Sequence, residues 1–265
     1  MDAVDTITSR QNPVVRRFRA AADNPGDSLL LDGAHLIEEA LAASVPIELV
    51  AIDESARTDA ALAQRAERAG ARVVRVPSKV LAAMTPVRQP SGVVAIGRRR
   101  ERSVAEVLAA APQMVLMLDE VQDPGNVGAI VRVAEACGAT GVITGYGTAD
   151  AMGWKALRGS MGSIFRLPVA VRQSLPETVR AARALGIEIL AAVPREGVPL
   201  PECDLRRPVA VLLGGEGAGL PDSLAALATT RLTIPMQRPV ESLNVATAAA
   251  LIAYEAHRQR SGVPS

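Results

Sequence analysis

The chain has 265 residues, of which 49% are hydrophobic, and its 29 basic and 28 acidic side chains leave a formal net charge of +1. This composition excludes a disordered polyelectrolyte and predicts a folded chain of one large domain or two small ones. Two cysteines and two histidines are too few for a disulfide framework or a His/Cys metal cluster, so we expect no bound metal.

No stretch approaches the roughly 18 uninterrupted apolar residues of a membrane span, and the first residues have neither the basic nor the apolar block of a signal peptide. We therefore expect a cytoplasmic protein. Residues 1–104 carry 15 basic and 13 acidic side chains, and residues 105–265 carry 14 and 15. Neither half has the basic excess typical of a nucleic-acid binder, so any binding to RNA must use local patches.

The first hundred residues alternate short apolar runs with segments of helical periodicity, a pattern that predicts strands covered by helices. Asn12-Pro13 is a typical helix start, because asparagine caps the helix and proline fits its first turn. Further helices are predicted over residues 34–42 and 59–69, and strands over residues 29–31, 47–52, 72–76 and 92–96. Together these elements predict a small α/β domain.

A charged run at residues 97–103, with no apolar face, follows this domain. It is either a linker between domains or the solvated start of a helix. If it is a linker, the chain divides into a first domain at residues 1–97, a linker at 98–110 and a second domain at 111–265.

The second domain shows continuous apolar runs such as residues 209–213, which are typical of strands buried on both faces of a parallel sheet. Strands are predicted over residues 114–118, 141–144, 188–193, 209–213 and 231–234, and helices near residues 127–137, 176–185 and 245–260.

The first segment that could carry chemistry follows the predicted strand at residues 114–118, where an acidic turn leads into a helix starting near Asn126. Ligands of open α/β sheets gather at such carboxyl ends of strands. Arg132 interrupts the otherwise apolar helix. The arginine could serve a site or only pair with a carboxylate, and Asn126 could be a plain helix cap.

The second segment is a buried strand that runs into a glycine-rich turn at residues 213–220. Glycines there would let backbone groups approach a ligand closely, although they could also serve only a tight turn. A dinucleotide-binding fingerprint needs glycine where Leu220 stands, so a nicotinamide dehydrogenase is a weak alternative.

The third segment, residues 234–244, runs from a strand through a proline-bracketed loop into the long C-terminal helix. Ser242 and Asn244 can each cap that helix. Small apolar residues repeat along one face of the helix, and that face would pack in the core or at a subunit interface.

The order and spacing of these segments resemble the SpoU/TrmH family of RNA 2′-O-ribose methyltransferases, part of the SPOUT class. The family's three motifs are similar to residues 126–138, residues 213–220, and residues 234–236 with 242–244. Residues 155–162 also resemble the family's segment between the first two motifs. Residues 7–96 resemble, more loosely, the L30e-like substrate-binding domain of members that act on ribosomal RNA.

The resemblance implies an α/β fold in which a small L30e-like domain precedes a catalytic domain with a parallel sheet and a deep trefoil knot. It also implies S-adenosylmethionine as cofactor, held by the turn of the second motif and the loop of the third, which suit a ligand with a polar edge and an apolar face. The residues carried over for this role are Leu213, Gly214, Gly215, Glu216, Gly217, Gly219, Leu220, Ile234, Met236, Ser242, Leu243 and Asn244.

The same resemblance implies a catalytic site made of Arg132, Asn126, Glu216, Ser242 and Asn244. Methyl transfer to a ribose hydroxyl requires alignment of the oxygen with the methyl group and removal of a proton. A guanidinium is a poor base, because its pKa lies above about 12, so we expect Arg132 to orient the 2′-hydroxyl and an adjacent phosphate. Asn126 and Asn244 would position Arg132 or the ribose, and Glu216 and Ser242 would lie near the cofactor or the RNA.

The implied activity is S-adenosylmethionine-dependent methylation of a ribose 2′-hydroxyl in RNA. The extra N-terminal domain favours 23S ribosomal RNA, because single-domain relatives that act on transfer RNA lack it. Family members pair their catalytic domains, so we expect a homodimer through the C-terminal domain. The alternatives are a transfer-RNA ribose 2′-O-methyltransferase and a non-catalytic RNA-binding or ribosome assembly factor of the same fold, although the five intact site residues argue against the latter.

Overall fold

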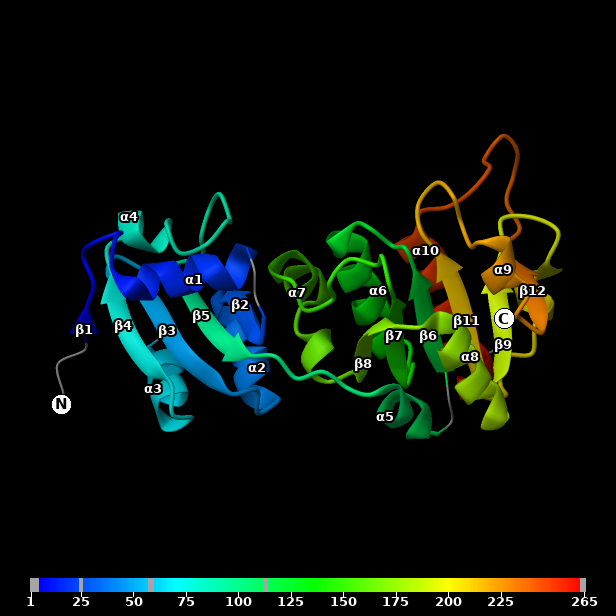
Figure 1. Cartoon of the computed structure of the whole chain (residues 1–265), viewed down its shortest axis with the longest axis horizontal. Helices are drawn as coiled ribbons and strands as arrows, with labels where there is room; N and C mark the ends of the chain where they lie inside the picture. The colour runs from blue at the N-terminus through cyan, green and yellow to red at the C-terminus, as the bar shows by residue number, and fades with distance from the viewer. Residues whose placement is uncertain (1–4, 24–25, 57–59, 112–113, 263–265) are drawn as a thin grey trace. The chain divides into compact units, whose positions relative to one another are not determined.

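The computed structural model describes residues 5–23, 26–56, 60–111 and 114–262. The chain forms two compact units (Figure 1). The first comprises residues 1–100 with residues 152–165, and the second comprises residues 101–151 and 166–265. The sequence-based domain limits, 1–97, 98–110 and 111–265, stay a prediction.

The first unit is built on a mixed five-stranded sheet in the order β1-β4-β3-β5-β2. Its central strand β3 is parallel to β4 and antiparallel to β5, which in turn is antiparallel to β2. The strands are β1 (Asp5–Thr6), β2 (Ser28–Asp32), β3 (Ile47–Asp53), β4 (Arg72–Val76) and β5 (Val93–Arg98).

Helices pack on this sheet through apolar faces. Asn12 opens the first helix as expected, because its Oδ1 accepts a hydrogen bond of 2.9 Å from the N–H of Val14. Phe18 on that helix and Met84 beyond α4 lie in one buried core cluster with residues of the sheet. The helices before the end of β5 are α1 (Pro13–Asp23), α2 (Ala34–Ala42), α3 (Ala60–Arg68) and α4 (Ser78–Leu81).

A segment remote in sequence completes the first unit. Helix α7 (Trp154–Ser160) contacts β2, and Trp154 packs against the core cluster of this unit. The ammonium of Lys155 lies 5.4 Å from the centre of the Trp154 ring. The 3-10 helix η1 (Ser163–Phe165) follows after Gly162, where a Cβ would lie 2.6 Å from Cγ of Glu39. Residues 152–165 therefore belong to the core of the first unit.

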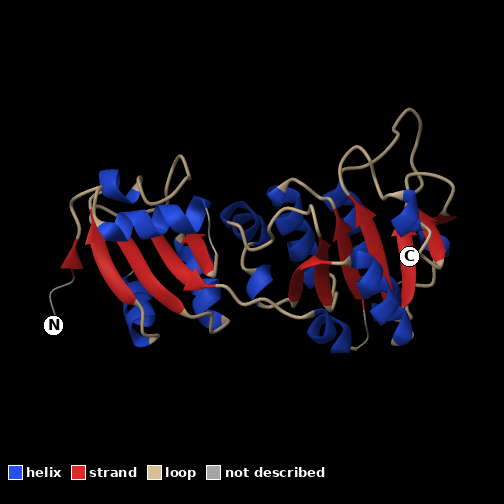
Figure 2. Ribbon diagram, viewed as in Figure 1, coloured by secondary structure: helices blue, strands red, loops and turns tan. Residues whose placement is uncertain are grey.

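The second unit contains a seven-stranded sheet in the order β10-β12-β9-β11-β6-β7-β8, and every pairing in it is parallel (Figure 2). The central strands are buried on both faces, as their apolar sequences predict. The strands are β6 (Met114–Asp119), β7 (Gly141–Gly145), β8 (Val169–Gln173), β9 (Glu188–Ala192), β10 (Val198–Pro199), β11 (Val209–Gly214) and β12 (Thr230–Thr233).

Two groups of helices accompany this sheet. Residues of α5, α8 and α9 share one core cluster with the strands, whereas α6 and α10 pack against each other. The helices are α5 (Val104–Ala109), α6 (Pro124–Ala136), α8 (Leu175–Ala184), α9 (Asp222–Ala225), α10 (Val245–Ser261) and the 3-10 helix η2 (Leu200–Glu202). Within the described part of the chain, no helix is both long enough and apolar enough to cross a membrane.

The α/β fold with a parallel C-terminal sheet is confirmed, whereas the trefoil knot stays a prediction. Helix α2 and strand β4 have the predicted limits. Helix α6 begins earlier than expected: Asp123 is its cap, with Oδ1 accepting a bond of 2.6 Å from Gly125 N–H, so Asn126 lies inside the helix. Residue 59, predicted as helical, lies outside the described residues. Strand β8 and the short helices α4, α7 and α9 were not predicted. Helix α5 begins directly after the charged run at residues 97–103, for which a linker and a helix start were both left open.

Candidate functional site

The three segments identified in the sequence meet at the carboxyl edge of the parallel sheet. Strands β6 and β11 are neighbours, with Leu118 opposite Leu213 and Asp119 opposite Gly214. The turn leading into α6 and the glycine-rich turn after β11 therefore start side by side. In open α/β sheets this edge is where ligands bind.

Three of the five predicted catalytic residues form a hydrogen-bonded chain. Asn126 donates through Nδ2 to the Glu216 carboxylate, and Asn244 donates through Nδ2 to Asn126 Oδ1 over 3.2 Å. Asn244 Oδ1 accepts from the backbone N–H groups of Ala246 at 2.9 Å and Thr247 at 3.3 Å. Asn244, and not Ser242, is therefore the cap of α10, and it joins the start of that helix to α6 and to the glycine-rich turn.

The glycine-rich turn is held by close backbone contacts. A Cβ at Gly214 would lie 2.2 Å from the carbonyl carbon of Gly219, and a Cβ at Gly215 would lie 2.1 Å from the carbonyl oxygen of Glu120. At both positions it is the protein's own backbone that requires glycine. Gly217 and Gly219 differ, because they have positive φ values of 95° and 68° and open space where a Cβ would stand.

A pocket of about 530 Å³ opens beside this turn, within the size range of small-molecule sites. The ends of β9, β11 and β12, the loop before α10 and the first turn of α10 surround it. All twelve residues predicted to hold a cofactor line the pocket: Leu213, Gly214, Gly215, Glu216, Gly217, Gly219, Leu220, Ile234, Met236, Ser242, Leu243 and Asn244.

Sequence reasoning missed other parts of the lining, notably Val193 after β9 and the charged side chains of Asp222 and Arg231. A signal existed for β9, since its strand was predicted and parallel strands bring their carboxyl ends to one edge. The position of β9 between β11 and β12 in the sheet could not be predicted from the local sequence. The lining thus combines apolar side chains, exposed backbone and both signs of charge, which suits S-adenosylmethionine with its adenine ring, carboxylate and sulfonium.

Arg132 stands apart from the hydrogen-bonded chain. It follows Asn126 by six residues, which on an α-helix means about 9 Å along the axis and about 120° around it. Its side chain is exposed. Within the described residues, no hydrogen bond or ion pair joins it to Asn126, Glu216 or Asn244. Ser242 is exposed as well and lines the pocket.

The acidic turn beside the pocket is unusual in its electrostatics. Burial raises the pKa of Asp119 above its usual value, and the neighbouring Glu120 carboxylate raises this pKa further. Over the described ranges, no three His, Cys, Asp or Glu side chains gather in a way that could hold a metal ion.

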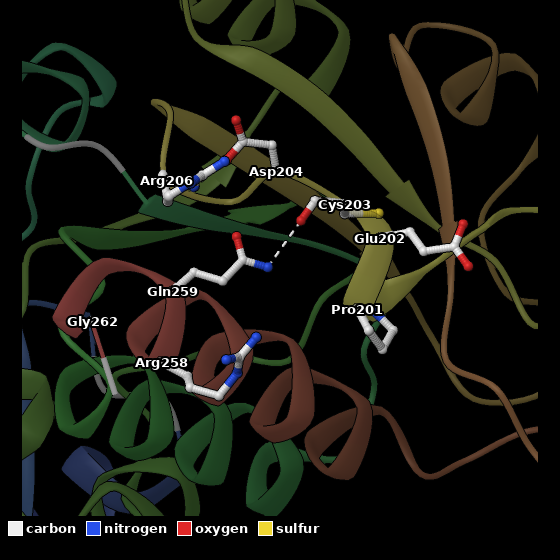
Figure 3. Close-up of a pocket in the computed structure, with 8 residues that line it drawn as sticks. All are labelled: Pro201, Glu202, Cys203, Asp204, Arg206, Arg258, Gln259 and Gly262. Atoms are coloured by element: carbon white, nitrogen blue, oxygen red, sulfur yellow. Dashed lines mark hydrogen bonds and ion pairs between the residues drawn. The ribbon is translucent and has the colours of Figure 1, made fainter. Parts of the chain in front are cut away.

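A second cavity, of about 410 Å³, lies at the far end of α10 (Figure 3). Arg206 donates through Nε to Asp204 over 2.8 Å, and Arg258 pairs with a carboxylate three residues before it at 2.7 Å. Gln259 donates through Nε2 to the carbonyl oxygen of Cys203 over 2.9 Å. The Gln259 bond joins the loop before β11 to the C-terminal helix, and none of the predicted site residues lines this cavity.

Comparison with known proteins gives two family matches. The model described as the SpoU rRNA Methylase family matches residues 113–254, and the model described as an MRM3-like substrate binding domain matches residues 16–95. The first match includes all three motifs, and the second lies within the first unit.

Similar individual proteins span nearly the whole chain. An uncharacterized tRNA/rRNA methyltransferase of Synechocystis is 35% identical over 97% of this chain and 95% of its own length. The 23S rRNA (guanosine(2553)-2′-O)-methyltransferase of Bacillus subtilis is 34% identical over 86% of this chain and 88% of its own. The crystal structure of an AdoMet-bound rRNA methyltransferase from Sinorhizobium meliloti has a TM-score of 0.87 at 30% identity and covers 99% of both chains.

Proposed function

Because the chain belongs to the SpoU rRNA methylase family, we propose that it transfers a methyl group from S-adenosylmethionine to a ribose 2′-hydroxyl of 23S ribosomal RNA. The observation that carries this proposal is the meeting of the three motifs at one edge of the sheet. The second and third motifs line the pocket, and hydrogen bonds join Asn126 of the first motif to Glu216 and Asn244. The similarity of residues 16–95 to a substrate-binding domain supports ribosomal RNA over transfer RNA. The enzyme would work in the cytoplasm, together with its ribosomal substrate.

The pocket beside the glycine-rich turn would hold the cofactor, which supplies an electrophilic methyl group when bound. Leu220, Ile234 and Met236 offer apolar contacts to the adenine and ribose, and the backbone of residues 214–219 offers hydrogen bonds to the adenine edge. Arg231 is the cation of the lining and would hold the carboxylate of the cofactor.

The chain's own side chains would position the acceptor. Arg132 would bind the ribose hydroxyl and an adjacent phosphate, as a fixed cation with several donors. Asn244 is fixed because its side chain caps α10, and it donates a hydrogen bond to Asn126. Asn126 in turn donates to the carboxylate of Glu216, which lines the pocket. A site held in this way needs little reorganisation when the reactants arrive.

The proposal includes a homodimer formed through the C-terminal unit. Helix α10 carries two exposed hydrophobic side chains, Leu251 at 42% and Tyr254 at 58% exposure, three residues apart and hence on one side of the helix. Such a pair is well suited to a subunit interface. The family resemblance implies sites completed near that interface, and the exposed position of Arg132 on α6, which packs against α10, fits this arrangement.

The test is transfer of labelled methyl from S-adenosylmethionine to unmodified large-subunit RNA, followed by alkaline digestion. A methylated 2′-hydroxyl cannot attack the neighbouring phosphate, so the label should appear in an alkali-resistant dinucleotide. Arg132→Ala should slow transfer by at least about 100-fold and leave cofactor affinity unchanged, because the arginine acts on the acceptor. The control Arg183→Ala, at an exposed arginine of α8, should match the wild type. Label on bases, label only in transfer RNA, or normal turnover by Arg132→Ala would each contradict the proposal.

A further inference from the structure

The carboxyl edge of the sheet carries a second feature, outside the three motifs. Strand β7 is followed directly by Tyr146, and the last two residues of β8 are Arg172 and Gln173, of which Gln173 pairs with Gly145. The Tyr146 side chain is 67% exposed, and Arg172 is exposed as well. Adjacent strand ends therefore present an aromatic ring and a guanidinium to solvent.

Arg172 owes its position to a β-bulge. Ile143 pairs with Ala170, but Gly145 pairs with Gln173, so β8 has one residue more than β7 over this step. Arg172 adopts a positive φ of 55°, and its backbone N–H donates 3.2 Å to the hydroxyl of buried Thr144. This conformation is costly for an arginine, and bulges that redirect a side chain in this way are frequent beside active sites. Among the described residues, no ion pair engages its guanidinium.

Tyr146 stands on a turn that is fixed from both sides. The N–H of Thr148 donates to the carbonyl oxygen of Gly145 over 3.3 Å, and its hydroxyl donates to Leu118 over 3.0 Å. The N–H of Ala149 donates to Val121 over 2.8 Å. The turn is thus bonded to the end of β6 and to the acidic turn before α6. A ring presented by a rigid turn loses little conformational freedom on binding a ligand.

Glu120 connects this turn to the cofactor pocket. A Cβ at Gly147 would lie 3.2 Å from Cγ of Glu120, and a Cβ at Gly215 would lie 2.1 Å from its carbonyl oxygen. The turns after β7 and β11 therefore both contact Glu120, one through its side chain and the other through its backbone. Gly147, which directly follows Tyr146, therefore contacts the residue that borders the glycine-rich turn, where nucleotides flanking a target ribose would pass.

We propose that Tyr146 and Arg172 form an RNA-contact patch that binds a nucleotide neighbouring the methylated one; this inference rests on the proposed function. Unpaired RNA bases stack on exposed aromatic rings, and arginine is a preferred partner of phosphate. The carboxylate of Glu120 beside Gly147 disfavours a phosphate at the tyrosine. The base therefore stacks on Tyr146, and the phosphate contacts Arg172 across the strand ends.

The test measures RNA binding and methyl transfer by Tyr146→Ala and Arg172→Ala in the full chain. The RNA probes are unmodified large-subunit RNA and a short fluorescent single strand of mixed sequence. Tyr146→Ala should weaken RNA binding about 5- to 150-fold through lost stacking, with the effect in KM and little change in kcat. Arg172→Ala should lower the slope of log affinity against log salt by about one. Calorimetric affinity for S-adenosylmethionine should stay at the wild-type value in both.

Two controls and one rescue make the outcome decisive. Leu185→Ala and Arg183→Ala remove an exposed apolar side chain and an exposed arginine elsewhere in the second unit and should have no effect. Tyr146→Trp should bind RNA as tightly as the wild type and more tightly than Tyr146→Ala, because a larger ring stacks at least as well. Wild-type RNA affinity and KM in Tyr146→Ala, or a Trp variant as weak as the Ala variant, would overturn the patch. If the wild type transfers no methyl group, the proposed function fails, whereas the single-stranded probe still decides whether the patch binds RNA.

Discussion

Replacement of Gly215 by alanine would test why the turn after β11 requires glycine. A Cβ at this position would lie 2.1 Å from the carbonyl oxygen and 2.8 Å from the carbonyl carbon of Glu120. Since non-bonded heavy atoms are best separated by about 3.5 Å, one of the two backbones must move by more than about 1 Å. The hydrogen bond from Ala149 to Val121 holds the acidic turn, so we expect the glycine-rich turn to move.

This movement should weaken cofactor binding by a definite amount. Forcing one extra carbon into a packed site costs about 1–3 kcal/mol. The free variant relieves the contact by displacing the turn, and a bound cofactor must restore the turn against that cost. Because about 1.4 kcal/mol corresponds to a tenfold change in affinity, S-adenosylmethionine should bind about 5- to 150-fold more weakly. Glu216, which moves with the turn, should also lose its hydrogen bond from Asn126.

Calorimetric titration with S-adenosylmethionine measures this effect, and thermal unfolding reports on the fold. Gly186→Ala is the control, because a Cβ there would meet no atom within 4 Å and the residue does not line the pocket, while its positive φ of 77° disfavours alanine and so strains the fold. This control should unfold at a lower temperature and bind the cofactor with wild-type affinity. Wild-type affinity in Gly215→Ala would refute the close contact with Glu120 as the reason for the glycine.

Three further perturbations follow from the same geometry. Asn244→Asp keeps the oxygen that caps α10 but loses the N–H donor to Asn126, so thermal stability should stay native and methyl transfer should be at least about tenfold slower. Methyl transfer at the wild-type rate would show that the hydrogen bond from Asn244 to Asn126 is only structural. Tyr254→Glu should dissociate the dimer in sedimentation experiments, with Leu185→Glu as control, and a variant that sediments as the wild type does would contradict the α10 interface. Hydrogen bonds from the backbone and side chain of Ser103, and then from Arg102, lower the pKa of Glu106 from 4.5 to about 2. The contribution of the Glu106 carboxylate to the stability of the folded state is therefore complete above pH 4.5 and is lost as the pH falls toward 2. Urea unfolding of Glu106→Gln should therefore show a weaker acid dependence than the wild type over that interval, and parallel curves would contradict this assignment.

Apolar patterning predicted the strands that are buried on both faces. Strands β6 and β11 are uninterrupted apolar runs, and their predicted ends differ from the observed ones by a single residue. Strand β8 was missed because its apolar run is short and ends in the polar pair Arg172 and Gln173. The bulge that exposes Arg172 depends on pairing with β7, which local sequence does not encode.

The site was predictable only where its residues lie in contiguous motifs. Asn126 and Glu216 are 90 positions apart, and no local rule predicts their hydrogen bond, so the family resemblance was needed to place them in one site. The start of α6 had a local signal that was not used. Pro124 fits the first turn of a helix, which favours Asp123 over Asn126 as the cap.

The inclusion of residues 152–165 in the first unit has a consequence for synthesis on the ribosome. Domains generally fold as units, in order of their emergence from the N-terminus. Here the nascent first hundred residues lack Trp154 and the helix that contacts β2. By the time these residues emerge, β6, α6 and β7 of the second unit have already been translated. Translation past residue 165 is therefore the earliest point at which the first unit can complete its core, so the two units mature in overlapping rather than successive steps.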